Sequence, residues 1–186
     1  MGLHPTMVGG QKYVTEKVEM PKIGSPLTDE ERRHLRRLLD EDAIKTLTLH
    51  YSHFLDHHYL ERLRDVFTQD VICEFGPYGS WEGIDTVLAN YETVNRDMGA
   101  HPFVAMHANT GHWIAWEDAD TALGRRQLID FDLTRPADEN PLLWLGMYED
   151  RYLRTSAGWR ISHMRLQFLW PERVISEDFP GSFARR

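Results

Sequence analysis

The chain has 186 residues, of which 41% are hydrophobic, and a formal net charge of -8. This length suits a single domain that buries a sizeable core without disulfides or metal ions to hold it together. The acidic balance, with no face that concentrates Lys and Arg, argues against nucleic-acid binding, and no apolar run approaches the roughly 20 residues that cross a bilayer. Because no signal-peptide pattern opens the chain, we expect a cytoplasmic protein that binds neither nucleic acid nor membrane.

The first predicted element is an N-terminal arm over residues 1–27, which carries several Pro and Gly residues and no sustained hydrophobic period. Thr28 and Glu31 have the spacing of a capping box, so a helix should begin there. In such a box the threonine oxygen accepts a hydrogen bond from the backbone N–H three residues on, while the glutamate carboxylate accepts one from the backbone N–H of the threonine. We place the domain at residues 28–170 and a C-terminal tail or lid at residues 171–186.

A long helix follows, because apolar residues recur every three or four positions and form a stripe on one helical side. The stripe comprises Leu35, Leu38, Leu39, Ala43, Ile44, Leu47, Tyr51, Phe54 and Leu55. It stops at Leu55, and Asp56 falls nearly opposite its centre at about 100° per residue. The helix therefore either ends at Asp56 or has a second covered face. A carboxylate at such a joint can cap the helix, orient a histidine or move a proton.

Three histidines near the end of this helix could present their imidazoles to a zinc ion. They are His50, His53 and His57, at spacings of three and four residues. Histidines beside the polar surface of a helix are commonly solvated instead, so we predict no metal site.

After Asp70 the pattern changes from helix period to strands. The elements expected after the long helix are a short helix at 59–67, strands at 71–75 and 80–83, a helix at 84–98, and strands at 103–116, 121–134, 142–155 and 159–170. Turn-forming segments separate the last four strands, which therefore form an antiparallel meander. Helices first and a meander last predict an α+β fold. The single cysteine, Cys73, is interpreted as a buried side chain in a reducing compartment.

The strand at 103–116 carries large or special side chains at both parities. One parity gives Val104, Met106, Ala108, Ile114 and Trp116, and the other gives Phe103, His107, Asn109 and Trp113. A meander strand with one face in water shows clean alternation instead. We therefore expect a sheet that curls around a cavity or is buried in an oligomer.

Four blocks, by their order and spacing, resemble a known family. They are AIKTLTLHYSHFLD, LRDVFTQDVICEFGPYGSWEG, MHANTGHW and YEDRYLRTSAGWRI. Over roughly residues 40–170 the chain resembles the SnoaL-like branch of the nuclear transport factor 2 superfamily, which includes scytalone dehydratase, hexachlorocyclohexane dehydrochlorinase and bile acid 7-alpha dehydratase. The resemblance implies a cone-shaped α+β barrel, in which a strongly curved, mostly antiparallel sheet packs on about three helices around an internal pocket.

The resemblance also implies a catalytic dyad of Asp56 and His107, with no metal or organic cofactor. A buried carboxylate that accepts the ring N–H fixes the tautomer of His107 and raises the basicity of its other nitrogen. Some members add a tyrosine and an arginine, for which Tyr51 and Arg165 are the candidates. Tyr51 and Asp56 lie about 140° apart on an ideal helix, so both face one pocket only if the helix deforms near its end. Arg165 faces the pocket in only one register, because a slip of one residue moves it to the other face.

Six further residues are candidates for substrate binding: Asn109, His112, Trp113, Phe103, Trp81 and Tyr148. Asn109 or His112 corresponds to an asparagine that the family often carries after the strand histidine. The aromatic candidates imply a bulky apolar substrate, although aromatic side chains are core residues by default.

The prediction is therefore a cofactor-independent lyase, namely a dehydratase that removes water from a bulky hydroxylated small molecule of polycyclic, steroid-like or aromatic type. A ketosteroid-type isomerase or polyketide cyclase is one alternative, since the same base can return its proton elsewhere. A non-catalytic ligand-binding or assembly subunit, such as the small subunit of ring-hydroxylating dioxygenases, is another. The expected partners are the small-molecule substrate and further copies of the chain, in a dimer or trimer.

Overall fold

The structure is a computed structural model, and it describes residues 24, 26–97, 105–133, 138 and 142–179. Nearly all of the predicted N-terminal arm lies outside the described residues, and so does Phe103. The chain divides into two compact units, residues 1–36 and residues 37–186. The candidate site lies wholly within the second unit.

The first helix, α1 (Asp29–Asp56), begins at the predicted capping box and ends at Asp56, which is the first of the two alternatives that the sequence left open. The Glu31 carboxylate accepts hydrogen bonds from the backbone N–H and the hydroxyl of Thr28, at 2.7 and 2.8 Å. In return the Thr28 hydroxyl oxygen accepts the Glu31 N–H at 3.2 Å. The capping-box prediction is thus confirmed, and the orphan amides at the start of the helix have partners.

In the described part of the chain, six strands form one sheet in the order β2-β1-β6-β5-β4-β3. The strands are β1 (Phe67–Glu74), β2 (Ser80–Glu82), β3 (Ala105–Trp116), β4 (Thr121–Asp132), β5 (Leu142–Thr155) and β6 (Gly158–Trp170). The other helical segments are η1 (Leu60–Asp65), η2 (Gly76–Tyr78) and α2 (Ile84–Asp97). Only β1 and β6 run parallel; all other neighbours are antiparallel. The predicted meander and the α+β class are confirmed.

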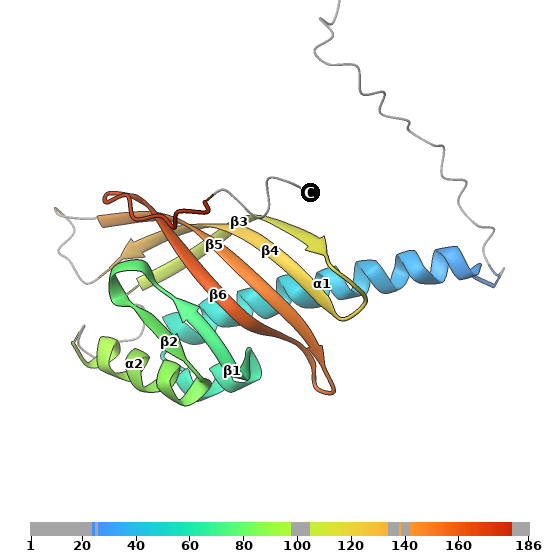
Figure 1. Cartoon of the computed structure of the whole chain (residues 1–186), viewed down its shortest axis with the longest axis horizontal. Coiled ribbons are helices and arrows are strands. Elements are labelled where there is room, and N and C mark those ends of the chain that lie inside the picture. Colours follow the sequence, from blue (N-terminus) through green and yellow to red (C-terminus); the bar gives the residue numbers. More distant parts are fainter. Residues whose placement is uncertain (1–23, 25, 98–104, 134–137, 139–141, 180–186) are drawn as a thin grey trace, which may run out of the picture. The chain divides into compact units, whose positions relative to one another are not determined.

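The helices cover one face of this curved sheet. Figure 1 shows α1 passing behind the long strands, while α2 lies against β1 and β2. One hydrophobic core joins the inner face of the sheet to α1, η1 and α2, with Ile44, Leu63 and Val87 fully buried at 0% exposure. Cys73 is also fully buried in this core, as predicted. We call the helix-covered face the inner face and the opposite one the outer face.

A β-bulge in β3 changes which of its residues face inward. Thr110 pairs with Gln127 and Trp113 pairs with Arg125, so three steps along β3 match two steps along β4. The extra residue lies near Gly111, whose φ of 58° suits glycine because it has no Cβ. The residues after the bulge therefore face the opposite way from the one that their sequence parity with His107 indicates. Ile114 and Trp116 pack against the core, while Trp113 lies on the outer face and is 46% exposed.

The described part of the predicted tail, residues 171–179, folds back onto the sheet. Val174 exchanges two backbone hydrogen bonds with Phe168, at 2.9 and 3.0 Å. Ser176 then binds the buried amide of Gln167 through its own N–H and its hydroxyl, at 2.8 and 2.7 Å. Residues 171–179 do not line the internal cavity described below. The lid function stays a prediction, since residues 180–186 lie outside the described part.

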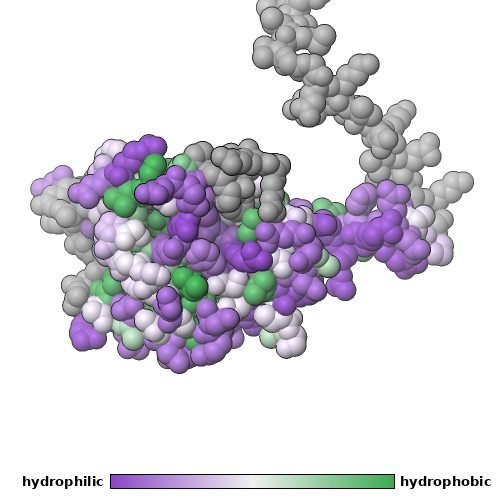
Figure 2. All heavy atoms as spheres, in the orientation of Figure 1, coloured by the Kyte–Doolittle hydropathy of each residue, from purple (hydrophilic) through white to green (hydrophobic). Residues whose placement is uncertain are grey.

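The visible surface is mainly hydrophilic, with isolated apolar spots, as Figure 2 shows in the orientation of Figure 1. Among the described residues, none of the helices combines the length and the apolar character needed to span a membrane.

Candidate functional site

An internal cavity of about 420 Å³ lies between the helices and the inner face of the sheet, which confirms the predicted pocket. Its walls are mainly aromatic and aliphatic and include Phe75, Trp81, Tyr91, Trp144 and Phe168. Only a few polar groups enter it. Such an apolar cavity with a small number of convergent polar groups is the usual form of a small-molecule site.

Asp56 and His107 meet in this cavity, as the sequence predicted. The Nδ1–H of His107 donates to Oδ1 of Asp56 at 2.5 Å, and the backbone N–H of His107 donates to Oδ2 at 3.1 Å. Both side chains are largely buried, with exposures of 14% for His107 and 12% for Asp56. Because Asp56 accepts from Nδ1 and from the backbone, it fixes the ring orientation and leaves Nε2 for another partner.

The position of Asp56 follows from how α1 ends. The N–H of His58 donates to the carbonyl of Leu55, and the N–H of Tyr59 donates to the carbonyl of Phe54. This pair of bonds is a Schellman motif, which turns the chain sharply away from the helix axis. Asp56 lies in the last turn of α1, next to β3, and its carboxylate accepts a hydrogen bond from the backbone N–H of His107 on that strand.

Asp130 was missed by the sequence analysis and completes the polar centre of the cavity. It lies on β4 directly opposite His107, and its Oδ2 is 3.8 Å from the Nε2 of His107. Its Oδ1 is buried without a hydrogen-bond partner among the described residues. One signal was available: Asp130 shares strand parity with the buried Leu128, so alternation along β4 already placed a carboxyl group on the inner face.

The electrostatic surroundings shift both titrating groups. Burial lowers the pKa of His107, but the hydrogen bond to Asp56 and the negative charges of Asp130 and Asp56 outweigh it, so the pKa is raised above the ordinary 6.5. Burial raises the pKa of Asp130 above the ordinary 3.8, against the opposing effect of His107. The two groups therefore titrate as a coupled pair, which holds a single proton over the pH range between its two titrations.

Tyr51 lines the deep end of the cavity, together with Tyr148 and Tyr91. It is 1% exposed, and its hydroxyl lies 2.8 Å from that of Tyr91. Burial is the main cause that raises the pKa of Tyr51 well above its usual value, so the phenol stays neutral. Tyr51 and Asp56 thus both face one cavity, as the predicted arrangement requires.

Arg165 does not reach the cavity, and its predicted placement there is wrong. Its guanidinium binds Glu74 on β1 and Asp178 in the tail. The residues of β6 that line the cavity are Leu166 and Phe168. Arg165 has the opposite parity, and adjacent residues of a strand point to opposite faces.

The arginine on the inner face is Arg126 instead. It is 0% exposed, donates to Asp150 at 2.9 Å and lies 3.8 Å from the centre of the Tyr148 ring. It also donates to the side-chain oxygen of Asn109, whose amide nitrogen donates to Ser52 on α1 at 2.5 Å. Arg126 and Asn109 therefore lie beneath the cavity and support its deep end rather than line it.

The remaining predicted substrate-binding residues divide into two groups. Trp81 and Tyr148 line the cavity. His112 does not: its Nε2 lies 3.2 Å from the hydroxyl of Tyr152, and burial lowers its pKa to about 4. Trp113 is on the outer face because of the bulge. Phe103 lies outside the described residues.

The helix histidines do not form a metal site. The rings of His53 and His57 contact each other at a tilt of 40°, with their centres 4.1 Å apart, and His50 stacks on Phe54. Within the described ranges, no group of three or more His, Cys, Asp or Glu side chains is arranged to hold a metal ion.

The sequence profile of the SnoaL-like domain matches residues 36–165, which is more than half of the chain. The chain belongs to the SnoaL-like domain family. This family is part of the nuclear transport factor 2-like superfamily, so the predicted resemblance is confirmed. The matched range contains α1 from Arg36 onward, the polar centre of the cavity and most of β6.

Solved structures show the same fold at low sequence identity. A candidate scytalone dehydratase from Novosphingobium aromaticivorans is 20% identical with a TM-score of 0.63, over 76% of this chain and 94% of that one. A hexachlorocyclohexane dehydrochlorinase from Novosphingobium barchaimii is 19% identical with a TM-score of 0.63, over 77% and 99%. A nuclear transport factor 2-like protein from Novosphingobium aromaticivorans is 20% identical with a TM-score of 0.66, over 80% and 94%. No curated protein sequence matches this chain.

Proposed function

We propose that this SnoaL-like domain is a cofactor-independent lyase that removes water from a bulky, mainly apolar alcohol. The observation that carries the proposal is the position of His107 between two carboxyl groups in an aromatic cavity. Asp56 holds Nδ1 at 2.5 Å, while Asp130 lies 3.8 Å from Nε2. This arrangement supplies a base and an acid side by side, which an elimination across two neighbouring atoms requires.

The proposed reaction begins when the Nε2 of His107 takes a proton from a carbon next to the one that carries the hydroxyl. The electron pair of the broken C–H bond forms the new double bond, and the C–O bond breaks. Asp130, in its protonated form, gives its proton to the departing oxygen, which leaves as water. Asp56 stabilises the imidazolium that forms, because its carboxylate accepts the Nδ1–H throughout.

The cycle closes without any outside reactant. After elimination His107 carries an extra proton and Asp130 lacks one, and the two groups lie 3.8 Å apart. The proton can return from Nε2 to the carboxylate directly or through one water. The net change is substrate to alkene plus water, and both side chains recover their starting states.

The cavity lining supports the proposed class of substrate. A volume of about 420 Å³ with walls such as Phe75, Trp81 and Trp144 suits a ring system with few polar groups. Two of the structurally similar proteins are named for eliminations, one of water and one of hydrogen chloride. The same geometry is suited to the first of these, because Asp130 can protonate an oxygen leaving group.

The proposal is tested with single variants of the dyad and a panel of hydroxylated ring compounds. His107→Asn removes the base, and Asp56→Asn keeps an acceptor oxygen but loses the charge. We expect each to lower kcat/KM for water loss by about 100-fold or more, in the range of general acid–base effects. Mass spectrometry of the product follows the reaction, and His50→Asn on the exposed side of α1 is the matched control. Undiminished water loss by His107→Asn contradicts the proposal.

The same experiment separates the alternatives. A ketosteroid-type isomerase or cyclase uses the same base, yet an isomerisation leaves the product mass equal to that of the substrate. A non-catalytic ligand-binding or assembly subunit gives no turnover with any compound and no effect of His107→Asn beyond binding. Loss of one water that depends on His107 supports the dehydratase over both.

A further inference from the structure

His58 has a backbone conformation that its side chain disfavours. It occupies the position after the last helical turn of α1 with a φ of 59°, and it is the only residue other than glycine with a positive φ among those described. Glycine is the usual residue at this position of a Schellman motif, because a Cβ is unfavourable in the left-handed region. Here the two hydrogen bonds of the Schellman motif hold this conformation, and residues in such conformations cluster at ligand-binding sites.

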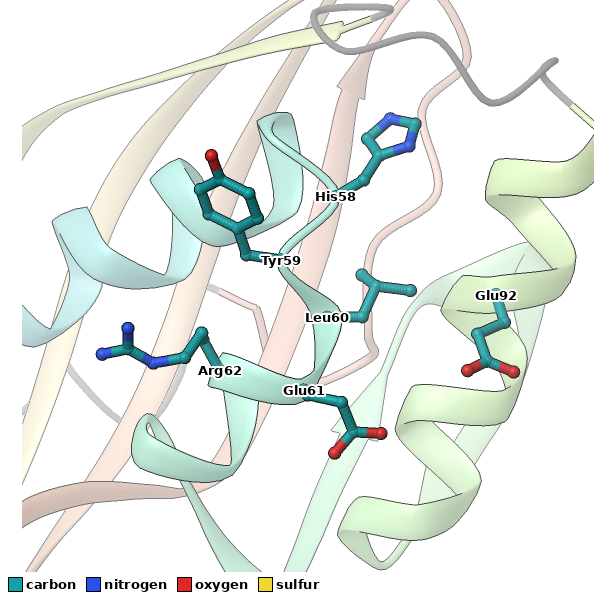
Figure 3. Close-up of a pocket in the computed structure, with 6 residues that line it drawn as sticks. All are labelled: His58, Tyr59, Leu60, Glu61, Arg62 and Glu92. Atoms are coloured by element: carbon teal, nitrogen blue, oxygen red, sulfur yellow. The ribbon is translucent and has the colours of Figure 1, made fainter.

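The side chain of His58 lies at the boundary of two cavities. It lines the internal cavity and also a second, more open groove of about 540 Å³ between η1 and α2. Figure 3 shows its imidazole on the connection between α1 and η1, pointing toward the end of α2. His58 is half-buried and lines both spaces, so it lies where the internal cavity meets the more open groove, which we call the mouth of the cavity.

The charges around this mouth limit what His58 can bind. Figure 3 shows Glu61 and Glu92 pointing into the space between η1 and α2, while Arg62 points to the other side. Arg62 binds Asp65 at 3.0 Å and lies over the ring of Phe54. Glu61 is paired with Arg64 at 2.9 Å, so Glu92 is the carboxylate of the groove lining that repels an anionic group. Beside it, the imidazole of His58 can donate a hydrogen bond to an uncharged oxygen.

We propose that His58 is a specificity-determining residue, which donates a hydrogen bond to a neutral keto or hydroxyl oxygen at the mouth-facing end of the substrate. The substrate class is then a ring compound with two oxygens. One is the hydroxyl that leaves beside His107, and the other is an uncharged oxygen that remains at His58. This inference rests on the proposed function for the identity of the reacting end, but binding at His58 needs no turnover.

Three rigid probes test the inference by isothermal titration at neutral pH on the full chain. They are 2-naphthol, the neutral ketone 1-(6-hydroxynaphthalen-2-yl)ethanone, and 6-hydroxy-2-naphthoate. We expect the protein to bind the ketone about five-fold more tightly than 2-naphthol, as one neutral hydrogen bond allows. The carboxylate probe is expected to bind more weakly than the ketone, because the Glu92 carboxylate lines the groove beside His58 and repels an anion.

His58→Gly removes the imidazole and relieves the backbone. It is expected to abolish the preference for the ketone, to leave 2-naphthol binding unchanged and to raise the thermal midpoint. His58→Asn, whose amide suits the left-handed region, should retain part of the preference. The control His50→Asn changes an exposed histidine of the same helix that lines neither cavity, and it should retain all of it.

Three results overturn the inference: wild-type protein that does not distinguish the ketone from 2-naphthol, a ketone preference that survives in His58→Gly, or tighter binding of the carboxylate than of the ketone. His107→Asn separates this inference from the proposed function. If His107→Asn keeps the ketone preference and still releases water at the wild-type rate, the proposed reaction is contradicted, whereas the proposed role of His58 is supported. If it keeps the preference and loses the reaction, both stand.

Discussion

At the scale of single residues, His107 and Asp130 must be treated as one titrating pair. Their facing atoms are 3.8 Å apart, both are largely buried, and each changes the pKa of the other. The active form in the proposed reaction holds one proton on Asp130, and it exchanges with the form in which Nε2 of His107 carries that proton and Asp130 is ionised. A second proton removes the base, and loss of the only proton removes the acid.

We therefore predict a bell-shaped dependence of kcat/KM on pH. The alkaline limb lies above pH 6.5, because the last proton leaves a pair in which the pKa of His107 is raised. The acid limb lies above pH 3.8, because the second proton adds to Asp130, whose pKa is also raised. In Asp130→Asn only His107 titrates, so activity should rise with pH to a plateau about 100-fold or more below the wild type.

The shape of the profile is the decisive readout for this variant. A merely structural role of Asp130 lowers activity at every pH but leaves both limbs in place. Asp132→Asn, the same change two residues along β4 and outside the cavity lining, provides the control. It should keep both limbs, with the acid limb moved to lower pH, because the charge of Asp132 raises the pKa of Asp130. An alkaline limb that persists in Asp130→Asn contradicts its role as the acid.

At the scale of the elements, Arg126 joins three strands and a helix beneath the cavity. It pairs with Asp150 on β5 from its place on β4, and it reaches α1 through Asn109 on β3 and then Ser52. His107 is two residues before Asn109 on the same face, while Asp56 is four residues after Ser52. The network thus fixes the two elements that bring the dyad together.

We predict that Arg126→Met destabilises the protein by about 3 to 5 kcal/mol, because it leaves the buried charge of Asp150 without its partner. Urea unfolding followed by circular dichroism measures the change. The double variant Arg126→Met, Asp150→Leu is the matched control, since removing both charges is often nearly neutral. A single variant as stable as the wild type contradicts the assignment of a buried ion pair.

The elements also show where sequence reasoning succeeds and where it stops. Element order, the capping box at Thr28 and the end of α1 at Asp56 follow from local periodicity and local hydrogen bonding. Which face of the sheet a strand residue lies on does not follow from local sequence. The bulge near Gly111 places Trp113 on the outer face. Arg165 lies on the outer face as well, because it is one residue away from Leu166, which faces inward. Both positions depend on the register in which the strand pairs with its neighbour, which the sequence of the strand alone does not give.

At the scale of the whole second unit, the two faces of the sheet carry different groups of side chains. The inner face carries the cavity and its reactive groups, while the outer face carries ion pairs and the returning tail. Arg165, Gln167 and Glu149 on the outer face bind Asp178, Ser176 and Arg125. The dyad was predictable because family motifs mark it, whereas Asp130 and Arg126 depend on which strands of the folded sheet lie opposite each other.

This division predicts that shortening the tail affects stability but not catalysis. A chain that ends at Val174 keeps the backbone pairing with Phe168, a residue of the cavity wall, but loses Ser176 and Asp178. Gln167, now 1% exposed, then exchanges two protein hydrogen bonds for water. We expect a loss of about 1 to 2 kcal/mol, or a fall of about 2 to 8 °C in the thermal midpoint, with kcat and KM unchanged.

Asp178→Asn with Ser176→Ala in the full-length chain is the matched variant, because it weakens the same contacts without removing the segment. It should reproduce a part of the fall in thermal midpoint. A KM that rises tenfold in the shortened chain but not in the double variant assigns the tail beyond Val174 to the cavity mouth, as a lid. Equal KM values in all three proteins place its role on the outer face, where the contacts of Ser176 and Asp178 lie.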